Sequence, residues 1–345
     1  MNNKIILKTA TILDALNQLN LIRDASRLIL FVKDEKNRII GSLTDGDIRR
    51  ALIKGKALNQ KIDAVCNMNF TYINKDYSFV NLNFYRKKKI KMLPVLSEDK
   101  KLVEVIDLER VRSVLPLECM IMAGGRGKRL SPLTDKVPKP MLLLGDKPII
   151  EHNIDRLISF GIKKIYISVK YLGEQIEAYF GDGSSKGISI EYIWEEKALG
   201  TAGALSLVEK FNSSHVLLMN SDLFTNVDFE DLYLTLINTE AEMVVSSKEY
   251  KVDVPYAVFQ TDGERVKDFM EKPSFIYQSN AGIYILKTSL INEIPKNEFY
   301  DITDLMEKIV KEKRKLIYNP ILGFWIDIGK PVDYDYAQNF IKHIN

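Results

Sequence analysis

A chain of 345 residues is long for one typical domain and suits two. Its 46% hydrophobic and 28% charged residues are typical of an ordinary globular protein, and a net charge of +3 gives no reason to expect binding to nucleic acid or to a membrane. Two cysteines are too few for a disulfide framework or a metal cluster, no run is long enough to span a membrane, and no signal peptide opens the chain, so we expect a cytoplasmic protein.

The first 115 residues contain a weak internal repeat of roughly 60 residues, which predicts a small α+β module. Copy one predicts a helix that begins at the capping box Thr11-x-x-Asp14, followed by strands at Leu28–Val32 and Ile39–Leu43. The residues Thr44–Asp47 then begin a second helix over Ile48–Ile53. Copy two predicts the same order, with a helix over Tyr77–Phe84, strands at Met92–Leu96 and Leu102–Ile106, and a helix from Asp107.

This order of elements, together with the string Gly41–Ile48, resembles a CBS-domain pair. The resemblance implies that Thr44 and Asp47 contact the ribose of an adenine or guanine nucleotide at a helix N-terminus, where the helix dipole also favours a polar ligand. The residues alone fit equally well with Thr44 as a simple helix cap. Copy two departs from the pattern at three positions, Val103, Ile106 and Glu109. We therefore expect at most one ligand site, and the module can instead serve folding or the formation of a homodimer.

From residue 118 to residue 345 strands and helices alternate, which predicts a second domain. The expected strands are Cys119–Met122, Lys164–Val169, Ile188–Trp194 and His215–Met219, and the expected helices are Ile149–Phe160, Glu174–Phe180 and Gly203–Phe211. This order predicts an α/β fold with a Rossmann-like mixed, mostly parallel sheet and helices on both faces. Ligands of such sheets bind at the carboxyl ends of the strands.

A glycine-rich turn follows the first of these strands. Ala123 precedes three glycines, Gly124, Gly125 and Gly127. Two bases follow, Lys128 and Arg129, and a third, Lys139, lies ten residues on. Glycine lets backbone N–H groups approach a phosphate closely, and Arg and Lys neutralise its charge. Leu130 stands where a dinucleotide fingerprint needs its third glycine, and a P-loop is also absent. The turn therefore indicates a triphosphate cradle, with a plain strand-to-helix turn and a solvated basic face as the alternative.

Further polar or small residues lie near expected strand ends. Gly200 and Thr201 leave room for a flat base to pack against backbone. Asp222 stands just past an apolar strand and Asp327 follows another, where carboxylates can hold Mg²⁺ against phosphate oxygens. Glu271 can accept a hydrogen bond from a hydroxyl group, and Lys272 beside it supplies a counter-charge for phosphate. Ordinary turns, caps and surface ion pairs are the alternatives at each position.

Together these strings resemble sugar-1-phosphate nucleotidyltransferases, which join a nucleoside triphosphate to a sugar 1-phosphate and release pyrophosphate. The resemblance implies a nucleotidyltransferase catalytic domain over residues 118–345. The implied nucleotide-binding residues are Ala123, Gly124, Gly125, Gly127, Gly200 and Thr201, and the implied sugar-phosphate-binding residues are Glu271, Lys272, Asn280 and Gly282. The implied catalytic residues are Arg129, Lys139, Asp222 and Lys272, and the implied Mg²⁺ ligands are Asp222 and Asp327.

The CBS pair and the turn Leu199–Gly203 resemble bacterial guanylyltransferases of legionaminic-acid-type pathways. That likeness implies GTP and glucosamine 1-phosphate as substrates. Ala257 stands where relatives commonly carry glycine, and this leaves the sugar open. The alternatives are thymidylyl, uridylyl or cytidylyl transfer to another hexose 1-phosphate, or a non-catalytic subunit that binds a nucleotide sugar. Because the basic and acidic residues of the expected site are all present, an enzyme is favoured.

Overall fold

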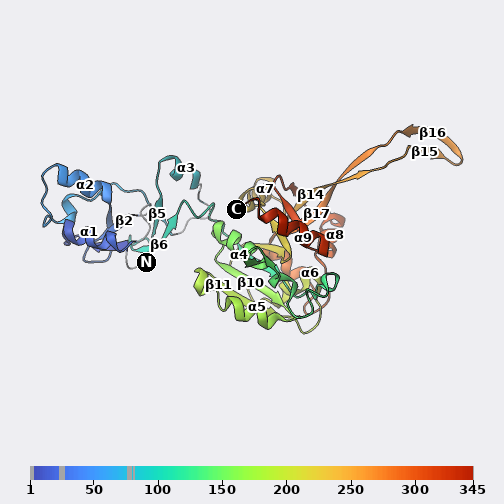
Figure 1. The fold of residues 1–345 in the computed structure, drawn as a ribbon, viewed down its shortest axis with the longest axis horizontal. Helices are drawn as coiled ribbons and strands as arrows, with labels where there is room; N and C mark the ends of the chain where they lie inside the picture. Colours follow the sequence, from blue (N-terminus) through green and yellow to red (C-terminus); the bar gives the residue numbers. More distant parts are fainter. Residues whose placement is uncertain (1–3, 23–27, 76–79, 81, 345) are drawn as a thin grey trace. The chain divides into compact units, whose positions relative to one another are not determined.

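The computed structural model describes residues 4–22, 28–75, 80 and 82–344 (Figure 1). The chain divides into two compact units, one ending at Val114 and the other beginning at Leu115. Within the described ranges, no helix is both long enough and apolar enough to cross a bilayer.

The first unit contains two small sheets with the same strand order. One holds β1 (Ile5–Leu7), β2 (Ile29–Lys33) and β3 (Ile39–Thr44), and the other holds β4 (Ile73–Asn74), β5 (Met92–Leu96) and β6 (Leu102–Asp107). In both sheets the first pair of strands is parallel and the second pair is antiparallel. The internal repeat expected from the sequence is therefore confirmed. The helices within its described residues are α1 (Ile12–Asn20), α2 (Asp45–Ile53), α3 (Leu82–Lys87) and the 3₁₀ helix η3 (Ile62–Ala64).

In copy one, both helices begin where the sequence predicts. In copy two, the helices differ from the prediction. Thr11 caps α1 through a complete capping box with Asp14. In copy two, α3 is described from Leu82, and its expected start at Tyr77 lies outside the described residues. The helix expected from Asp107 is wrong, because residues 108–110 form only a turn. Pro116 lies too close for a helix to develop before the chain extends into the next strand.

The second unit is built on a mixed sheet of seven strands in the order β11-β10-β7-β12-β17-β14-β18. Their bounds are β7 (Glu118–Met122), β10 (Lys164–Val169), β11 (Ser189–Trp194), β12 (His215–Asn220), β14 (Met243–Asp253), β17 (Ser274–Lys287) and β18 (Leu316–Pro320). Only β17 runs antiparallel to its neighbours, and every other pair of strands is parallel. The expected mostly parallel α/β sheet is confirmed.

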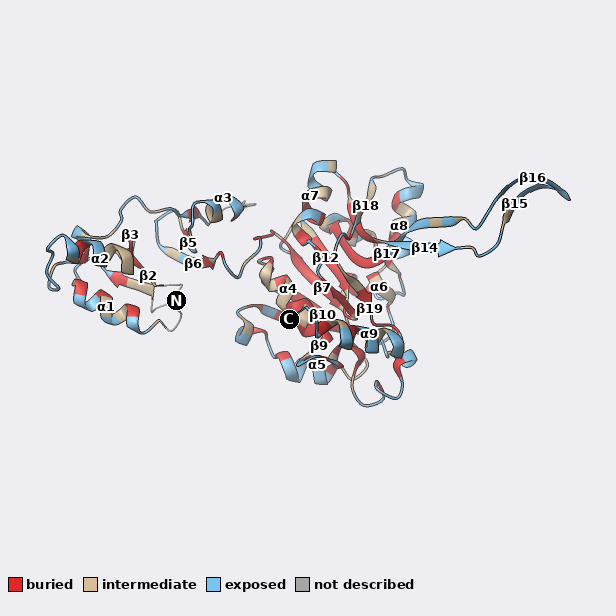
Figure 2. Cartoon of the chain, turned by 45° about the horizontal axis from the view of Figure 1, so that its top comes forward, coloured by how far each residue is buried: buried red, intermediate tan, exposed pale blue. Residues whose placement is uncertain are grey.

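The strand order reverses at β7, which pairs with β10 on one side and β12 on the other. Ligands of open α/β sheets bind where the order reverses, beyond the carboxyl ends of the strands. Both faces of the sheet are buried, as Figure 2 shows for the central strands. The helices around the sheet are α4 (Ile149–Ser159), α5 (Gly173–Phe180), α6 (Gly200–Gly203), α7 (Phe229–Thr239), α8 (Ile302–Lys311) and α9 (Pro331–Ile341).

Shorter elements complete the second unit. They are the 3₁₀ helices η4 (Lys128–Leu130), η5 (Lys139–Met141), η6 (Ser184–Lys186), η7 (Ala204–Leu207) and η8 (Thr288–Glu293), and the strands β8 (Leu143–Leu144), β9 (Lys147–Pro148), β13 (Leu223–Thr225), β15 (Val258–Asp262), β16 (Arg265–Met270) and β19 (Trp325–Asp327). The helix expected over Gly203–Phe211 is wrong. The chain forms one turn of α6 and then η7, because backbone bonds to Tyr300 hold this stretch against the start of α8.

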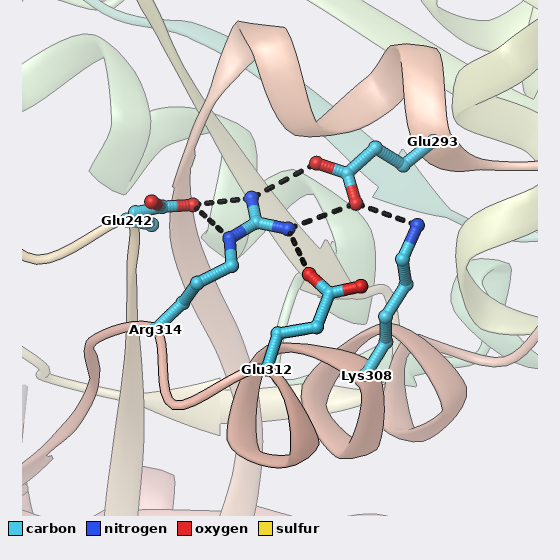
Figure 3. A network of polar contacts seen from close by, with 5 residues as sticks. All are labelled: Glu242, Glu293, Lys308, Glu312 and Arg314. Atoms are coloured by element: carbon cyan, nitrogen blue, oxygen red, sulfur yellow. Dashed lines mark hydrogen bonds and ion pairs between the residues drawn. The ribbon is translucent and has the colours of Figure 1, made fainter.

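An ion network holds α8 to the sheet (Figure 3). The Arg314 guanidinium, just after α8, contacts the carboxylates of Glu242, Glu293 and Glu312, and Lys308 of α8 lies 2.8 Å from Glu293. The hydrogen bonds from Arg314 are the largest cause that lowers the pKa of Glu293, to about 2. Because the network ties the beginning of β14, the end of η8 and the end of α8 together, it fixes the helix that borders the candidate site.

Candidate active site

A cavity of about 470 Å³ lies beyond the carboxyl ends of β7 and β12. This volume is in the range of small-molecule sites. Four basic side chains line it, those of Lys128, Arg129, Lys139 and Lys170, against two acidic ones, Glu195 and Asp222. The excess of positive charge suits a polyanionic ligand.

The glycine turn packs directly on the segment that carries Lys139. Gly127 has a φ of 66°, and a Cβ at this position would lie 2.9 Å from the Cβ of Lys139. Thr134 donates a hydrogen bond of 2.9 Å to the carbonyl of Gly127, which holds the turn in place. At Gly125, by contrast, a Cβ would meet no protein atom within 4 Å, so its backbone faces open space at the cavity.

Lys139 and Asp222 meet on the wall of the cavity. The Lys139 ammonium contacts Oδ2 of Asp222, and the side chains are only 11% and 21% exposed. Oδ1 of Asp222 is buried and has no hydrogen-bond partner. Asp327 lies beside this pair. Strand β13 pairs with β19 so that Leu223, the residue after Asp222, lies opposite Asp327. Desolvation raises the pKa of Asp327, and the nearby charge of Asp222 raises it further.

These two carboxylates fit a magnesium site. Mg²⁺ prefers oxygen ligands and is usually held by one or two carboxylates together with substrate phosphates. The unpartnered Oδ1 of Asp222 is an available ligand, and a cation would relieve the repulsion that raises the pKa of Asp327. Within the described ranges, no group of three or more His, Cys, Asp or Glu residues is arranged to hold a metal, so phosphate oxygens would complete the coordination.

A second wall of the cavity is formed by the turn at Gly200 and Thr201. The carboxylate of Asp301 accepts hydrogen bonds from the backbone N–H of Thr201 at 2.9 Å and from its hydroxyl at 3.1 Å. Gly200 has a φ of 76°, and a Cβ there would lie 2.8 Å from the carbonyl oxygen of Tyr300. On the other side, Glu195 accepts a bond of 3.0 Å from the N–H of Leu199. These contacts hold the turn at the edge of the cavity.

Other expected site residues border this cavity without lining it. Ala123 is buried at the end of β7 and donates its N–H to the carbonyl of Ser168. Gly282 has a φ of 73°, and a Cβ there would lie 2.6 Å from the side chain of Asn220, which lines the cavity. The Asn280 side chain accepts a bond of 2.9 Å from the N–H of Gly282. These contacts place the middle of β17 next to the site.

Glu271 and Lys272 lie elsewhere. Both are exposed on a two-stranded ribbon that leaves the sheet and projects into solvent (Figures 1 and 2). Neither residue lines the cavity. The structure thus brings together Gly124, Gly125, Gly127, Arg129, Lys139, Gly200, Thr201 and Asp222, and it leaves the expected sugar-phosphate pair apart from them.

In the first unit, Thr44 and Asp47 satisfy one another. Asp47 donates its N–H to the Thr44 hydroxyl at 3.2 Å, and its carboxylate accepts from the Thr44 N–H at 2.8 Å and from the hydroxyl at 2.6 Å. The helix-cap alternative is therefore present in the structure. Thr44 also lines a pocket of about 330 Å³, together with Phe31, Lys89 and Lys91.

Sequence reasoning missed two residues of the cavity wall, Lys170 and Phe299, and gave no role to Glu195, which also lines the cavity. Asp301, which accepts the hydrogen bonds from Thr201 in the turn at Gly200 and Thr201, was also missed. Its pattern Asp301-x-x-Asp304 is a capping box that opens α8, and this signal was available in the sequence.

Comparisons with known proteins agree with this geometry. Residues 118–343 match the family model described as nucleotidyl transferase, and residues 3–54 match the model of the CBS domain. A mannose-1-phosphate guanylyltransferase catalytic subunit beta from Danio rerio is 30% identical over 226 residues, which are 63% of this chain and 62% of that protein. A UTP–glucose-1-phosphate uridylyltransferase from Synechocystis sp. is 32% identical over 242 residues, which are 63% of this chain and 61% of that protein.

Among solved structures, a Bacillus anthracis protein assigned as a glucose-1-phosphate thymidylyltransferase, in complex with a sucrose, is similar with a TM-score of 0.54. The two are 26% identical, and the match covers 66% of this chain and 96% of that one. The chain spans less than two thirds of the length of the two sequence relatives.

Proposed function

The chain belongs to the nucleotidyl transferase family, and from that premise we propose that it transfers a nucleotidyl group from a nucleoside triphosphate to a sugar 1-phosphate. The products are a nucleotide sugar and pyrophosphate. One observation carries the proposal. Four basic side chains converge on a cavity in which Asp222 keeps a buried oxygen without a partner.

The reaction needs positioning and charge neutralisation more than covalent chemistry. A phosphate oxygen of the sugar 1-phosphate attacks the α-phosphorus in line, and pyrophosphate leaves. We assign the β- and γ-phosphates to the backbone N–H groups of the turn at Gly124–Gly127 and to Arg129. This placement is supported by the open space at Gly125 and by the position of Arg129 on the cavity wall.

Lys139 is assigned to the charge that builds on the α-phosphoryl group. Its ammonium is largely buried against Asp222, which holds the side chain at the junction of the turn and β12. A buried cation strengthens its interaction with a developing negative charge, because little water screens it. When bound at Asp222 and Asp327, Mg²⁺ would supply the further positive charge that two phosphate-bearing substrates require.

The base and the sugar are proposed separately. We propose GTP, because the turn Leu199–Gly203 resembles that of guanylyl-transferring relatives and its backbone N–H and C=O groups can recognise the edge of a base. We propose glucosamine 1-phosphate on the resemblance of the combined domains. The similar proteins named above act on different bases and sugars by their names, so they support the reaction class rather than this choice.

A substrate panel tests the proposal. The purified full-length protein is incubated with Mg²⁺, each of five nucleoside triphosphates and a set of hexose 1-phosphates, and pyrophosphate release is followed. GTP with glucosamine 1-phosphate should give the highest kcat/KM. Preference for another pair would change the named substrates and keep the reaction class, whereas binding of a nucleotide sugar without any pyrophosphate release would favour a non-catalytic subunit.

A further inference from the structure

The most unusual feature of the second unit is the ribbon of residues 248–279, here termed the arm (Figures 1 and 2). Strands β14 and β17 stay paired from Ser247 and Asn280 out to Asp253 and Ser274, and β15 pairs with β16 beyond them. An isolated two-stranded ribbon is only marginally stable in water. The arm therefore needs a surface to pack against, and along its described length most of its residues are exposed.

The base of the arm has two different faces. Residues that pair across an antiparallel ribbon point to the same side, and successive pairs alternate. One face carries the pairs Tyr250–Tyr277 and Val252–Phe275. Tyr250 is 62% exposed and Tyr277 is 57% exposed. The other face carries mostly polar side chains, those of Glu249, Lys251, Asp253, Ser274 and Gln278, with Ile276 among them. An apolar face of this kind is typical of an interface.

The arm also carries a strained corner where Glu271 and Lys272 stand. Lys272 has a φ of 43° and is followed by Pro273. Positive φ is unfavourable for lysine, and a following proline disfavours helical backbone further. Strained backbone of this kind is concentrated at functional sites. The corner lies between the end of β16 at Met270 and the beginning of β17 at Ser274.

The intact ribbon keeps this corner out of reach of the cavity of its own chain. Asn280, which borders the site, lies eight positions after Lys272, and a strand rises about 3.3 Å per residue, so an extended chain places the two up to about 26 Å apart. A lysine side chain spans far less than this. The ribbon is also pinned where it leaves the sheet, since Lys248 donates to the carbonyl of Gly323 at 3.0 Å and Ser279 donates to the carbonyl of Lys248 at 2.7 Å.

We infer that the arm crosses to a second copy of this chain, where Glu271 and Lys272 complete that copy's cavity. The inference rests on the proposed function, which assigns this pair to the sugar phosphate. A second copy is the fitting occupant, because it offers the same cavity without its own Glu–Lys pair. A two-fold axis makes the exchange reciprocal, so both cavities are completed and both apolar faces are covered.

Mixing two defective variants tests the exchange. Asp222→Asn damages the cavity and Lys272→Ala damages the arm. The two full-length variants are co-expressed in equal amounts and assayed near the wild-type KM for sugar phosphate. With exchanged arms, half of randomly formed dimers are mixed and each mixed dimer holds one intact site, so about a quarter of wild-type activity returns. If the arm serves its own chain, every site keeps a defect, and activity no higher than that of the separate variants overturns the inference.

A second readout does not depend on catalysis. The wild-type chain should sediment as a dimer, and the double variant Tyr250→Lys, Tyr277→Lys should dissociate. The matched control on the polar face, Glu249→Ser with Lys251→Ser, should remain a dimer. A monomeric wild type, or a double variant that associates as tightly as wild type, would overturn the exchange. If the wild type associates in this way but releases no pyrophosphate with any substrate pair, the proposed function fails while the exchange stands.

Discussion

The ammonium of Lys139 contacts Oδ2 of Asp222, although the two residues stand 83 positions apart in the chain. The contact joins the segment after the glycine turn to the carboxyl end of β12. Both residues are largely buried, and Oδ1 of the same aspartate is left without a partner. The Asp222 carboxylate thus positions the Lys139 ammonium, which we assign to the α-phosphoryl group. Its second oxygen is available to a metal ion.

Asp222→Asn should therefore abolish turnover while the fold is retained. The amide keeps the shape of the side chain but removes the negative charge from the metal site. We expect kcat to fall by about 10³-fold or more, as for the loss of a phosphate-clamping group. Asp327→Asn should lower kcat to a similar extent. The control is Asp335→Asn, an exposed position on α9, which should leave kcat unchanged. More than a tenth of wild-type activity in Asp222→Asn would remove this residue from the site.

Lys139→Ala and Lys272→Ala should give different kinetic defects. Lys139 meets a charge that grows in the transition state, so its loss should lower kcat more than it raises the KM for nucleotide. Lys272 meets a charge already present on the acceptor, so its loss should mainly raise the KM for sugar phosphate. Steady-state kinetics with both substrates varied distinguishes the two, and the same nucleotide-binding defect in both variants would contradict the division of roles.

Two glycines of one turn provide a matched test of phosphate binding. At Gly125 an added methyl meets no protein atom, so Gly125→Ala should leave thermal stability unchanged. If phosphates approach this backbone, the methyl should raise the KM for nucleotide by about tenfold, or about 1.4 kcal/mol. Gly127→Ala should instead lower the melting temperature, because φ is 66° there and the methyl would meet Lys139. An unchanged nucleotide KM in Gly125→Ala would place the phosphates elsewhere.

The sequence predicts the sheet and one side of the site well. Buried strands such as Lys164–Val169 are short, apolar and followed by turn residues, and the structure has this strand with the same bounds. The turn at Gly124–Gly127 and Asp222 are local signals at strand ends. The order of strands then brings them together, because β7 and β12 are neighbours.

Other features depend on contacts that no local pattern contains. The stretch after Gly203 has helical composition, yet bonds to Tyr300 limit the helix to one turn, and that partner lies about a hundred residues away in sequence. Likewise, Glu271 and Lys272 end a strand as expected, but the length of the paired ribbon decides where that end lies. The place of Glu195 in the site likewise depends on its bond to the N–H of Leu199, which no local pattern predicts.

Acid should weaken the network around Arg314. The pKa of Glu293 is lowered from 4.5 to about 2, so its contribution to stability is present above about pH 4.5 and is lost as the pH falls toward 2. The network is partly exposed, and we expect a contribution of no more than about 1 kcal/mol. Glu293→Gln should flatten the loss of stability measured by denaturant unfolding between pH 5 and 2. Glu307→Gln, in an exposed pair with Lys311 on the same helix, is the control. An equal acid dependence in Glu293→Gln and wild type would show that the network adds nothing.

The first unit should bind a nucleotide if its pocket has the regulatory role that CBS pairs imply. Calorimetric titration of the full-length protein with adenine and guanine nucleotides measures this directly. Thr44→Val removes the hydroxyl of a residue that lines the pocket and should weaken binding, since the cap bonds to Asp47 are also lost. No heat with any nucleotide, under conditions in which the catalytic cavity is saturated, would leave the unit a folding or dimerisation module.

The most direct test of the central claim is the dependence of pyrophosphate release on both substrates. The full-length protein with Mg²⁺ should release pyrophosphate only when a nucleoside triphosphate and a sugar 1-phosphate are present together, and one nucleotide sugar should form for each pyrophosphate. Asp222→Asn should show neither product. Pyrophosphate or phosphate release that is independent of the sugar phosphate, or the same turnover in Asp222→Asn as in wild type, would contradict nucleotidyl transfer at this cavity.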